Sequence, residues 1–234
     1  MKLSYIIILS ISLFLSCCTN RLNDNPNIES IYVNNGQLYF KGDITESSLN
    51  HALTAINNYK GTIRTMTVNS LGGDIIPAMQ LGRWVFDNKI KLTVNRFCVS
   101  SCANYLFTAA ESVHINKNAV LIWHGGATQK SLLPKKHTSK DLEAFNHDIK
   151  IEKQFFEHIG VKEKITVYGQ LNDFSVMENT PECVKASDKG VLQGWTYSIE
   201  DLKKFGVDSI TSDNISPSVA DHGHLMACLI KVDF

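Results

Sequence analysis

The sequence predicts an α/β domain in which helices flank a mainly parallel sheet. Residues 62–68 and 90–94 are rich in β-branched and apolar residues and have the length of buried strands. Between them, residues 75–86 place apolar side chains at spacings of three and four, on one face of a helix. Strands that alternate with helices pair in parallel, because each helix returns the chain to the same edge of the sheet.

The remaining elements are predicted from the same local signals. Residues 31–40 form two alternating runs around Asn35-Gly36, a strong signal for a hairpin. Thr138-Ser-Lys-Asp141 is similar to a capping box and predicts the start of a long charged helix that ends near His158. Helices are also expected at 47–59, 101–110 and 198–206, strands at 119–123 and 207–210, a turn at 111–118 and a mobile loop at 129–137.

Length and charge limit the class of protein. At 234 residues, the chain has the length of one domain. Lys plus Arg and Asp plus Glu both number 23, so the formal net charge is zero. A nucleic-acid-binding protein needs a basic surface, so we expect no nucleic-acid partner.

The N-terminus has the pattern of an export signal. Lys2 precedes an apolar run from Tyr5 to Leu15, which is too short to span a bilayer comfortably. The run leads into Ser16-Cys17-Cys18, which resembles the bacterial lipobox, where a cysteine is lipidated. We therefore expect a lipoprotein of the bacterial cell envelope that faces the periplasm and is anchored to the membrane through Cys17, or through Cys18. An ordinary cleaved signal peptide or an uncut anchor is the alternative.

These patterns divide the chain into three parts. The residues after the signal are polar and rich in asparagine, too poor in apolar side chains to fold. We assign residues 1–17 to the lipoprotein signal peptide, 18–27 to a flexible tether and 28–234 to a single domain.

Four further cysteines are disulfide candidates: Cys98, Cys102, Cys183 and Cys228. An even number in an exported protein favours disulfides, and three pairings are open. A Cys98–Cys102 bond would enclose two serines, and Cys183–Cys228 would then tie the late region to the C-terminus. A metal site is the other interpretation of this cysteine spacing. Because no second ligand pair accompanies it, we expect no metal. Asp221-His-Gly-His224 is interpreted as a surface turn.

Unusual residues follow three predicted strands. They are Asn69-Ser-Leu-Gly-Gly-Asp74, the segment from Cys98 to Cys102, and His124-Gly-Gly126. In open α/β sheets, sites form beyond the carboxyl ends of the strands. Glycines let backbone N–H groups approach a ligand, and helix starts supply unpaired N–H groups. A serine at a helix start can thus combine with a histidine and an oxyanion-binding turn, although each piece alone is also common in purely structural roles.

The order of these motifs resembles the proteolytic subunit of Clp protease, in the Clp/crotonase superfamily. The similarity rests on Val68 to Asp74, Ser101 to Ala110, Leu121 to His124 and Tyr197 to Asp208. It implies a Clp/crotonase-like single domain. The chain resembles more closely the exported Clp-like bacterial proteins that carry Cys-x-Ser-x-Cys around the nucleophile.

The resemblance implies roles for particular residues. Ser101 takes the position of the nucleophile, with Ser100 as the alternative, and His124 takes that of the general base. The amides of Gly72 or Gly73, together with that of Cys102, would form the oxyanion hole.

Two features of the chain depart from the family. Gly194-Trp195 stands where the family has the aspartate that orients the histidine. Only Asp173 or Asp201 could replace it, if the fold brings one of them near. Without either of them, the site would be a Ser-His dyad or would have solvent in the third place, and both would be slower than a triad. Leu71 replaces a proline of the family turn.

Two functions follow from this comparison. The first is an exported, peptidase-like serine hydrolase that uses a Ser-His dyad on a peptide or protein substrate, without a cofactor or an ATPase partner. The second is a non-catalytic envelope lipoprotein that keeps the fold as a binding or assembly module. The resemblance also implies a homo-oligomer formed through the long helix from Lys140 to His158.

Overall fold

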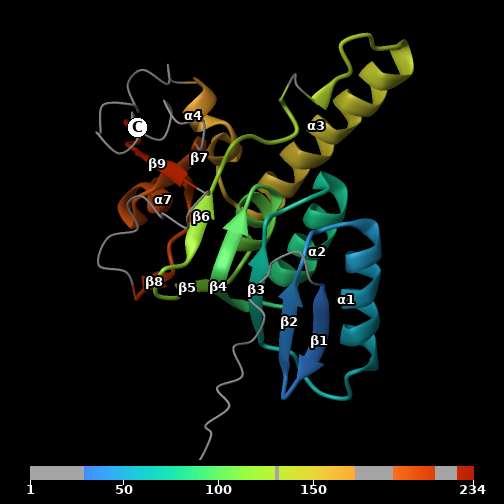
Figure 1. Ribbon diagram of the computed structural model, residues 1–234, viewed down its shortest axis with the longest axis vertical. Coiled ribbons are helices and arrows are strands. Elements are labelled where there is room, and N and C mark those ends of the chain that lie inside the picture. The colour runs from blue at the N-terminus through green and yellow to red at the C-terminus, as the bar shows by residue number, and fades with distance from the viewer. Residues whose placement is uncertain (1–28, 130–131, 172–191, 214–225) are drawn as a thin grey trace, which may run out of the picture.

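The computed structural model describes residues 29–129, 132–171, 192–213 and 226–234 (Figure 1). Within these residues, every helix falls short of the length or the apolar content that crossing a membrane requires. The predicted signal segment, the tether, Asp173, Cys183 and the Asp221–His224 motif lie outside the described residues.

The predicted fold class is confirmed: the protein is mixed α/β, and parallel strands dominate its central sheet. The strands of this sheet have the order β1-β2-β3-β4-β5-β8, and only the β1–β2 hairpin is antiparallel. The hairpin turns at Asn35 and Gly36, both with positive φ, as the sequence predicted. The strands are β1 (Ser30–Asn34), β2 (Gln37–Lys41), β3 (Thr65–Ser70), β4 (Lys91–Val99), β5 (Ser112–Ile115) and β8 (Ile210–Ser212).

The long strand β4 pairs with two different strands along its length. Its first half pairs with β5, and its last three residues, Phe97 to Val99, pair in parallel with β6 (Val120–Ile122). A second, two-stranded parallel sheet consists of β7 (Leu192–Tyr197) and β9 (Met226–Ile230). Reciprocal backbone hydrogen bonds of 2.8 Å between Trp123 and Trp195 join the end of β6 to β7.

The helices α1 (Glu46–Asn58), α2 (Ile75–Asp87) and α3 (Ser139–Ile159) lie on one side of the sheet, and the first half of α3 extends beyond the body of the domain (Figure 1). The capping box predicted at Thr138 and Asp141 is present. Gly206 ends α7 (Ile199–Phe205) in the left-handed conformation. Shorter helical elements are the π-helix η1 (Cys102–Phe107), the 3-10 helix η3 (Glu163–Thr166) and α4 (Tyr168–Leu171).

Three parts of the sequence prediction were wrong or incomplete. Residues 112–115, predicted as part of a turn, form strand β5, which uses the pattern Ser-Val-His-Ile to bury alternate residues. The strand predicted at 207–210 begins at Ile210 instead, because the preceding residues connect α7 to the sheet. The pair β7–β9 was not predicted, since its two strands are far apart in the sequence and their pairing is visible only in the folded structure.

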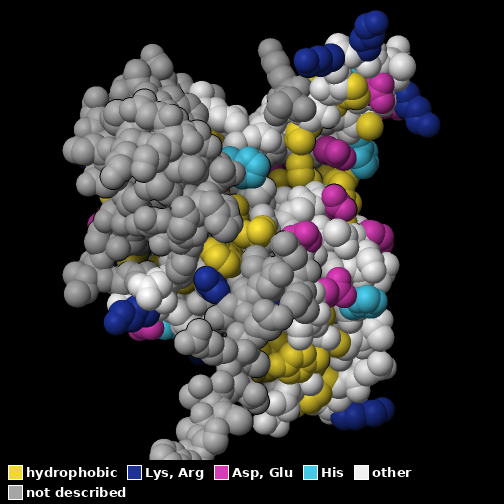
Figure 2. Space-filling view, viewed as in Figure 1, with side chains coloured by type: hydrophobic (Ala, Val, Ile, Leu, Met, Phe, Trp, Pro, Cys, Tyr) yellow, Lys and Arg dark blue, Asp and Glu magenta, His cyan; other side chains and the backbone are white. Residues whose placement is uncertain are grey.

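One face of the described residues carries charged side chains of both signs (Figure 2). Figure 2 shows acidic side chains along the helical side of this face and lysines or arginines mainly at its extremities. On the described part of this face, basic side chains do not form a continuous patch.

Candidate active site

Ser101 and His124 follow the carboxyl ends of two neighbouring parallel strands. Val99 of β4 is the register partner of Ile122 of β6, and each candidate residue comes two positions after its strand partner. The Ser100 N–H donates to the Ile122 carbonyl at 2.8 Å, which continues the pairing beyond the strands. The two segments predicted from sequence therefore lie at the same edge of the sheet.

Ser101 is held at the first turn of η1. It is the N-cap of this π-helix, a rare helix type that is often found at functional sites. Its side chain is only 3 % exposed, and its hydroxyl donates a hydrogen bond of 2.7 Å to the carbonyl of Gly73. The N–H of Cys102 lies in the first turn of η1, where amides have no partner within the helix.

The glycine turn after β3 is fixed by Ile44. The Ile44 N–H donates to the Gly72 carbonyl and the Asp74 N–H donates to the Ile44 carbonyl, both at 2.7 Å. These bonds leave the N–H and carbonyl of Gly73 on the side away from Ile44, where its carbonyl meets Ser101. Gly72 and Gly73 have φ of 98° and 143°, which favours glycine at both positions.

The two glycine amides differ in their hydrogen bonding. The Gly72 N–H already donates to Ser70 Oγ at 3.1 Å. The Gly73 N–H has no hydrogen-bond acceptor among the described residues, and Gly73 is exposed. Of the two glycine amides, that of Gly73 is therefore the one available to a ligand.

The structure contains a disulfide between Cys98 and Cys102, one of the pairs that the sequence left open. It joins the end of β4 to the start of η1 and encloses Ser100 and Ser101. Ser100 has a positive φ of 58° and is partly exposed, so its side chain is less covered than that of Ser101. Cys228 is buried. Because Cys183 lies outside the described residues, the pairing of Cys183 with Cys228 stays a prediction.

His124 lies in an exposed position, but the surrounding protein withdraws water from its ring. This desolvation lowers the pKa of His124 below its ordinary value of 6.5, because the charged form loses solvation. The backbone carbonyl of His124 accepts hydrogen bonds from the side-chain amides of Gln129 and, at 2.8 Å, Gln170. Within the described residues, no hydrogen bond joins the His124 ring to Ser101.

The position of the missing aspartate lies beside the histidine. A Cβ at Gly194 would stand 3.0 Å from the Cβ of His124, so β7 passes directly beside the histidine. The Asp201 carboxylate instead contacts Ser198 Oγ at 3.1 Å and Lys204 Nζ at 2.8 Å. Neither oxygen of Asp201 bonds to His124, and the described residues supply no other carboxylate to the ring.

Two further polar residues connect the candidate segments and were not identified from sequence. Asn104, in η1, donates from Nδ2 to the Gly125 carbonyl at 2.7 Å. Glu152, in α3, accepts from the Tyr105 hydroxyl and from the Ala127 N–H. Asn104 carries a visible signal, because it is a polar residue in an otherwise apolar stretch. Glu152 carries none, since charged residues surround it in the sequence.

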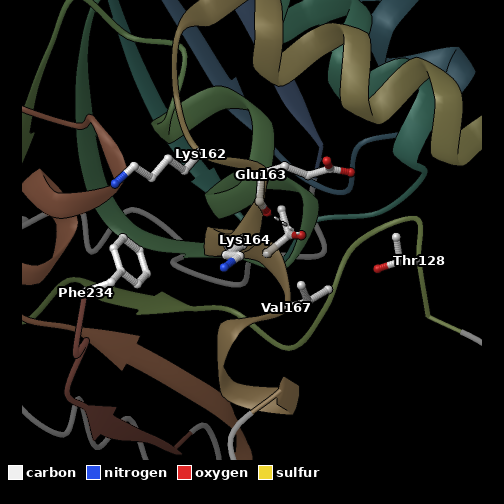
Figure 3. A pocket seen from close by; sticks show the side chains of 7 residues that line it. Thr128, Lys162, Glu163, Lys164, Val167 and Phe234 are labelled. Atoms are coloured by element: carbon white, nitrogen blue, oxygen red, sulfur yellow. Dashed lines mark hydrogen bonds between the residues drawn. The ribbon is translucent and has the colours of Figure 1, made fainter.

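A separate open cavity of about 560 Å³ is lined in part by Thr128, four residues after His124. Figure 3 shows Phe234 and Lys162 on one side of it and Thr128 on the other. The Lys162 ammonium lies 4.4 Å from the centroid of the Phe234 ring. Ser101 and His124 do not line this cavity.

Within the described residues, no group of three or more His, Cys, Asp or Glu side chains could hold a metal ion.

The fold and this geometry define an α/β protein with a serine, a histidine and a glycine turn at one edge of a parallel sheet. No model of a known protein family matches the sequence, and no curated protein matches it. Among solved structures, the chain is similar to methylmalonyl CoA decarboxylase complexed with 2S-carboxypropyl CoA, with 12% sequence identity and a TM-score of 0.33. The match covers 40% of this chain and 48% of that chain, so it spans about half of the decarboxylase. Similarity at this level is too low to transfer an activity.

Proposed function

We propose that this protein is an exported, peptidase-like serine hydrolase in which Ser101 is the nucleophile and His124 is the general base. The observation that carries the proposal is the 2.7 Å hydrogen bond between the Ser101 hydroxyl and the Gly73 carbonyl. It shows that the hydroxyl at the start of η1 lies against the backbone of the glycine turn. A nucleophile needs nearby amides for the oxyanion that its attack creates, and Gly73 and Cys102 supply two.

The proposed reaction proceeds through an acyl-enzyme. Ser101 Oγ attacks the substrate carbonyl carbon while its proton passes to the His124 ring, and the carbonyl electron pair moves onto oxygen. The Gly73 and Cys102 amides donate to this oxyanion. The tetrahedral intermediate then expels the leaving group, which takes the proton from His124. Water hydrolyses the acyl-enzyme by the same route and releases Ser101.

One rearrangement must precede this reaction. The Ser101 hydroxyl has to leave the Gly73 carbonyl and turn toward His124, with which it forms no hydrogen bond in this structure. Catalytic hydrogen bonds are often loose before a substrate binds, so the observed state is compatible with an unliganded enzyme. The neutral form of His124 is already favoured, because desolvation lowers its pKa.

The same proposal places the protein in the bacterial envelope, anchored by lipid at Cys17 or Cys18. The Cys98–Cys102 disulfide supports export, because disulfides persist in oxidising compartments. A periplasmic enzyme would have no ATP-driven unfoldase, so its substrate would be a short or unstructured peptide. The proposal also includes a Clp/crotonase-like domain and a homo-oligomer whose subunits associate through α3.

The alternative is a non-catalytic module that binds or assembles through the same fold. Two observations favour it: Ser101 is almost fully buried, and Gly194 leaves His124 without a carboxylate among the described residues. A histidine without an orienting carboxylate is a weaker base in catalysis.

A fluorophosphonate probe distinguishes the two functions. The purified full-length protein in detergent micelles is incubated with the probe, alongside the Ser101→Ala, Ser100→Ala and His124→Gln variants. The hydrolase proposal expects labelling of the unmodified protein and of Ser100→Ala, strong loss in His124→Gln and complete loss in Ser101→Ala. If the folded protein is not labelled, the binding module is favoured. If only Ser100→Ala abolishes labelling, Ser100 is the nucleophile.

A further inference from the structure

A buried carboxylate connects three elements around the candidate site. Glu152 is fully buried in the second half of α3. One of its oxygens accepts from the Tyr105 hydroxyl at 2.5 Å, and the other accepts from the Ala127 N–H at 3.0 Å. Tyr105 belongs to η1, which Ser101 begins, and Ala127 stands three residues after His124. The carboxylate therefore connects the helix of the nucleophile to the segment of the base.

The backbone of this segment approaches Glu152 closely. A Cβ at Gly126 would stand 2.5 Å from Glu152 Oε1 and 2.7 Å from Thr166 Oγ1, so only glycine fits here without a shift. A second hydrogen bond also links η1 to this segment: Asn104 donates to the Gly125 carbonyl at 2.7 Å. Both sides of the Gly125–Ala127 backbone are thus held by polar side chains that are themselves buried.

Burying a carboxylate here costs free energy unless strong hydrogen-bond or ionic partners compensate for the lost solvation. Burial raises the pKa of Glu152 to about 6, while its hydrogen bonds with Tyr105 and Ala127 act in the opposite direction. No basic side chain forms an ion pair with Glu152 in the described residues. An apolar residue would fill the same space without this cost. Unlike an apolar residue, the carboxylate accepts hydrogen bonds from both Tyr105 and Ala127.

We propose that Glu152 is a positioning residue that holds the segment from His124 to Ala127 against the helix that begins at Ser101. This inference rests on the proposed hydrolase function for its catalytic consequence, whereas the restraint on the backbone stands apart from it. Glu152 does not touch the reacting atoms. It acts through the Ala127 amide and the Tyr105 hydroxyl, which fix where the His124 ring can be presented.

The test compares Glu152→Gln with Glu143→Gln in the full-length protein. Glu143 is an exposed residue of the same helix, so its substitution makes the same chemical change without the contacts. A glutamine at 152 has one acceptor oxygen and one N–H₂ group in place of two acceptor oxygens, so the hydrogen bonds from Tyr105 and Ala127 cannot both persist as they are. Hydrogen exchange of the Ala127 amide, measured by NMR, should accelerate about tenfold or more in Glu152→Gln only. Fluorophosphonate labelling should slow by about tenfold or more.

The outcomes separate the two proposals. Unchanged Ala127 exchange in Glu152→Gln overturns the positioning role, whatever the labelling does. Faster exchange with unchanged labelling also overturns it, because the restraint then has no effect on the reactive serine. If the unmodified protein is not labelled, the hydrolase proposal fails, while faster exchange still supports the restraint.

A second variant keeps the proposal testable if Glu152→Gln does not fold. Tyr105→Phe removes one donor and keeps the Ala127 bond to Glu152. If Glu152→Gln does not fold, Tyr105→Phe should still slow labelling with little change in Ala127 exchange. Labelling at the unmodified rate in Tyr105→Phe contradicts a role for this link.

Discussion

The α-carbon of Gly194 lies against the side chain of His124, since a Cβ at position 194 would stand 3.0 Å from the Cβ of His124. The same atom would stand 2.1 Å from the carbonyl oxygen of Trp123. This carbonyl accepts the backbone hydrogen bond from Trp195 and cannot move without breaking the pairing of β6 with β7. The position next to the histidine is therefore close enough for an orienting carboxylate but too crowded for any side chain.

Restoring the missing acid at this position should fail. Gly194→Asp is expected to destabilise the protein by roughly 1–3 kcal/mol, because the new side chain overpacks against Trp123. Its labelling by a fluorophosphonate should not increase. Gly160→Asp is the steric control, since no atom lies within 4 Å of a Cβ there and its only cost is that of a side chain at a φ of 71°. Urea unfolding measures both variants, and an unchanged stability with faster labelling in Gly194→Asp would contradict the steric argument.

The pH dependence of labelling should report the desolvated histidine. Only neutral imidazole can accept the Ser101 proton, and the pKa of His124 is lowered below 6.5 by desolvation. The labelling rate should therefore rise with pH, with a midpoint below 6.5, and reach a plateau above it. The measurement is the initial labelling rate between pH 4.5 and 8 for the unmodified protein and for His124→Gln. The same profile in both proteins would remove His124 from the reaction.

Glu152 should make the folded protein less stable as pH rises. Its pKa is about 6 in the fold against an ordinary 4.5, so the folded state binds this proton more tightly than the unfolded state. The free energy of unfolding should thus fall by about 2 kcal/mol between about pH 4.5 and pH 6, and this contribution stays constant above that range. The nearby titratable groups are Tyr105 of η1, whose pKa is raised far above this range, and Glu163 of η3.

Urea unfolding at several pH values measures the free energy of unfolding, and the unmodified protein is compared with the two variants. Glu152→Gln should lose the part of the slope that Glu152 causes, and Glu143→Gln should keep it. Parallel pH dependences in the unmodified protein and in Glu152→Gln would mean that Glu152 does not titrate differently in the folded state.

Loss of the Cys98–Cys102 disulfide should lower stability moderately. The bond closes a loop of only five residues, for which chain entropy predicts about 2 kcal/mol of stabilisation. The double variant Cys98→Ala/Cys102→Ala should show this loss in urea unfolding, together with slower labelling, because the bond fixes the backbone around Ser100 and Ser101. Dithiothreitol added to the variant serves as the control, since any further loss then belongs to another disulfide. A variant as stable as the unmodified protein would show that the bond adds nothing to folding.

Local patterns predicted most of the first half of the fold. Asn35-Gly36 indicated the hairpin because few residues other than glycine and asparagine adopt positive φ readily. The spacing of Ile75, Met79 and Val85 indicated helix α2, and Gly72-Gly73 indicated the turn before it. These signals are local, since the conformations of neighbouring residues cause them.

The candidate site was predictable in its members but not in its connections. Ser101, His124 and the two glycines could be identified because strand ends and helix starts carry recognisable residues. That the Ser101 hydroxyl bonds to Gly73, and not to His124, depends on side-chain directions that no pattern encodes. Glu152 was not recognised at all, because it is buried against residues that are distant along the chain, such as Tyr105 of η1.

By itself, the sequence determined an α/β chain with parallel strands, a nearby pair of cysteines and a set of polar residues at strand ends. Such features follow from periodicity, backbone preference and residue chemistry, which act over a few neighbouring positions. Only the tertiary structure decided which strand lies beside His124, which glycine amide is available and which carboxylate connects η1 to the segment after His124. Those outcomes depend on contacts between residues distant along the chain, whose register is set when the sheets and helices pack.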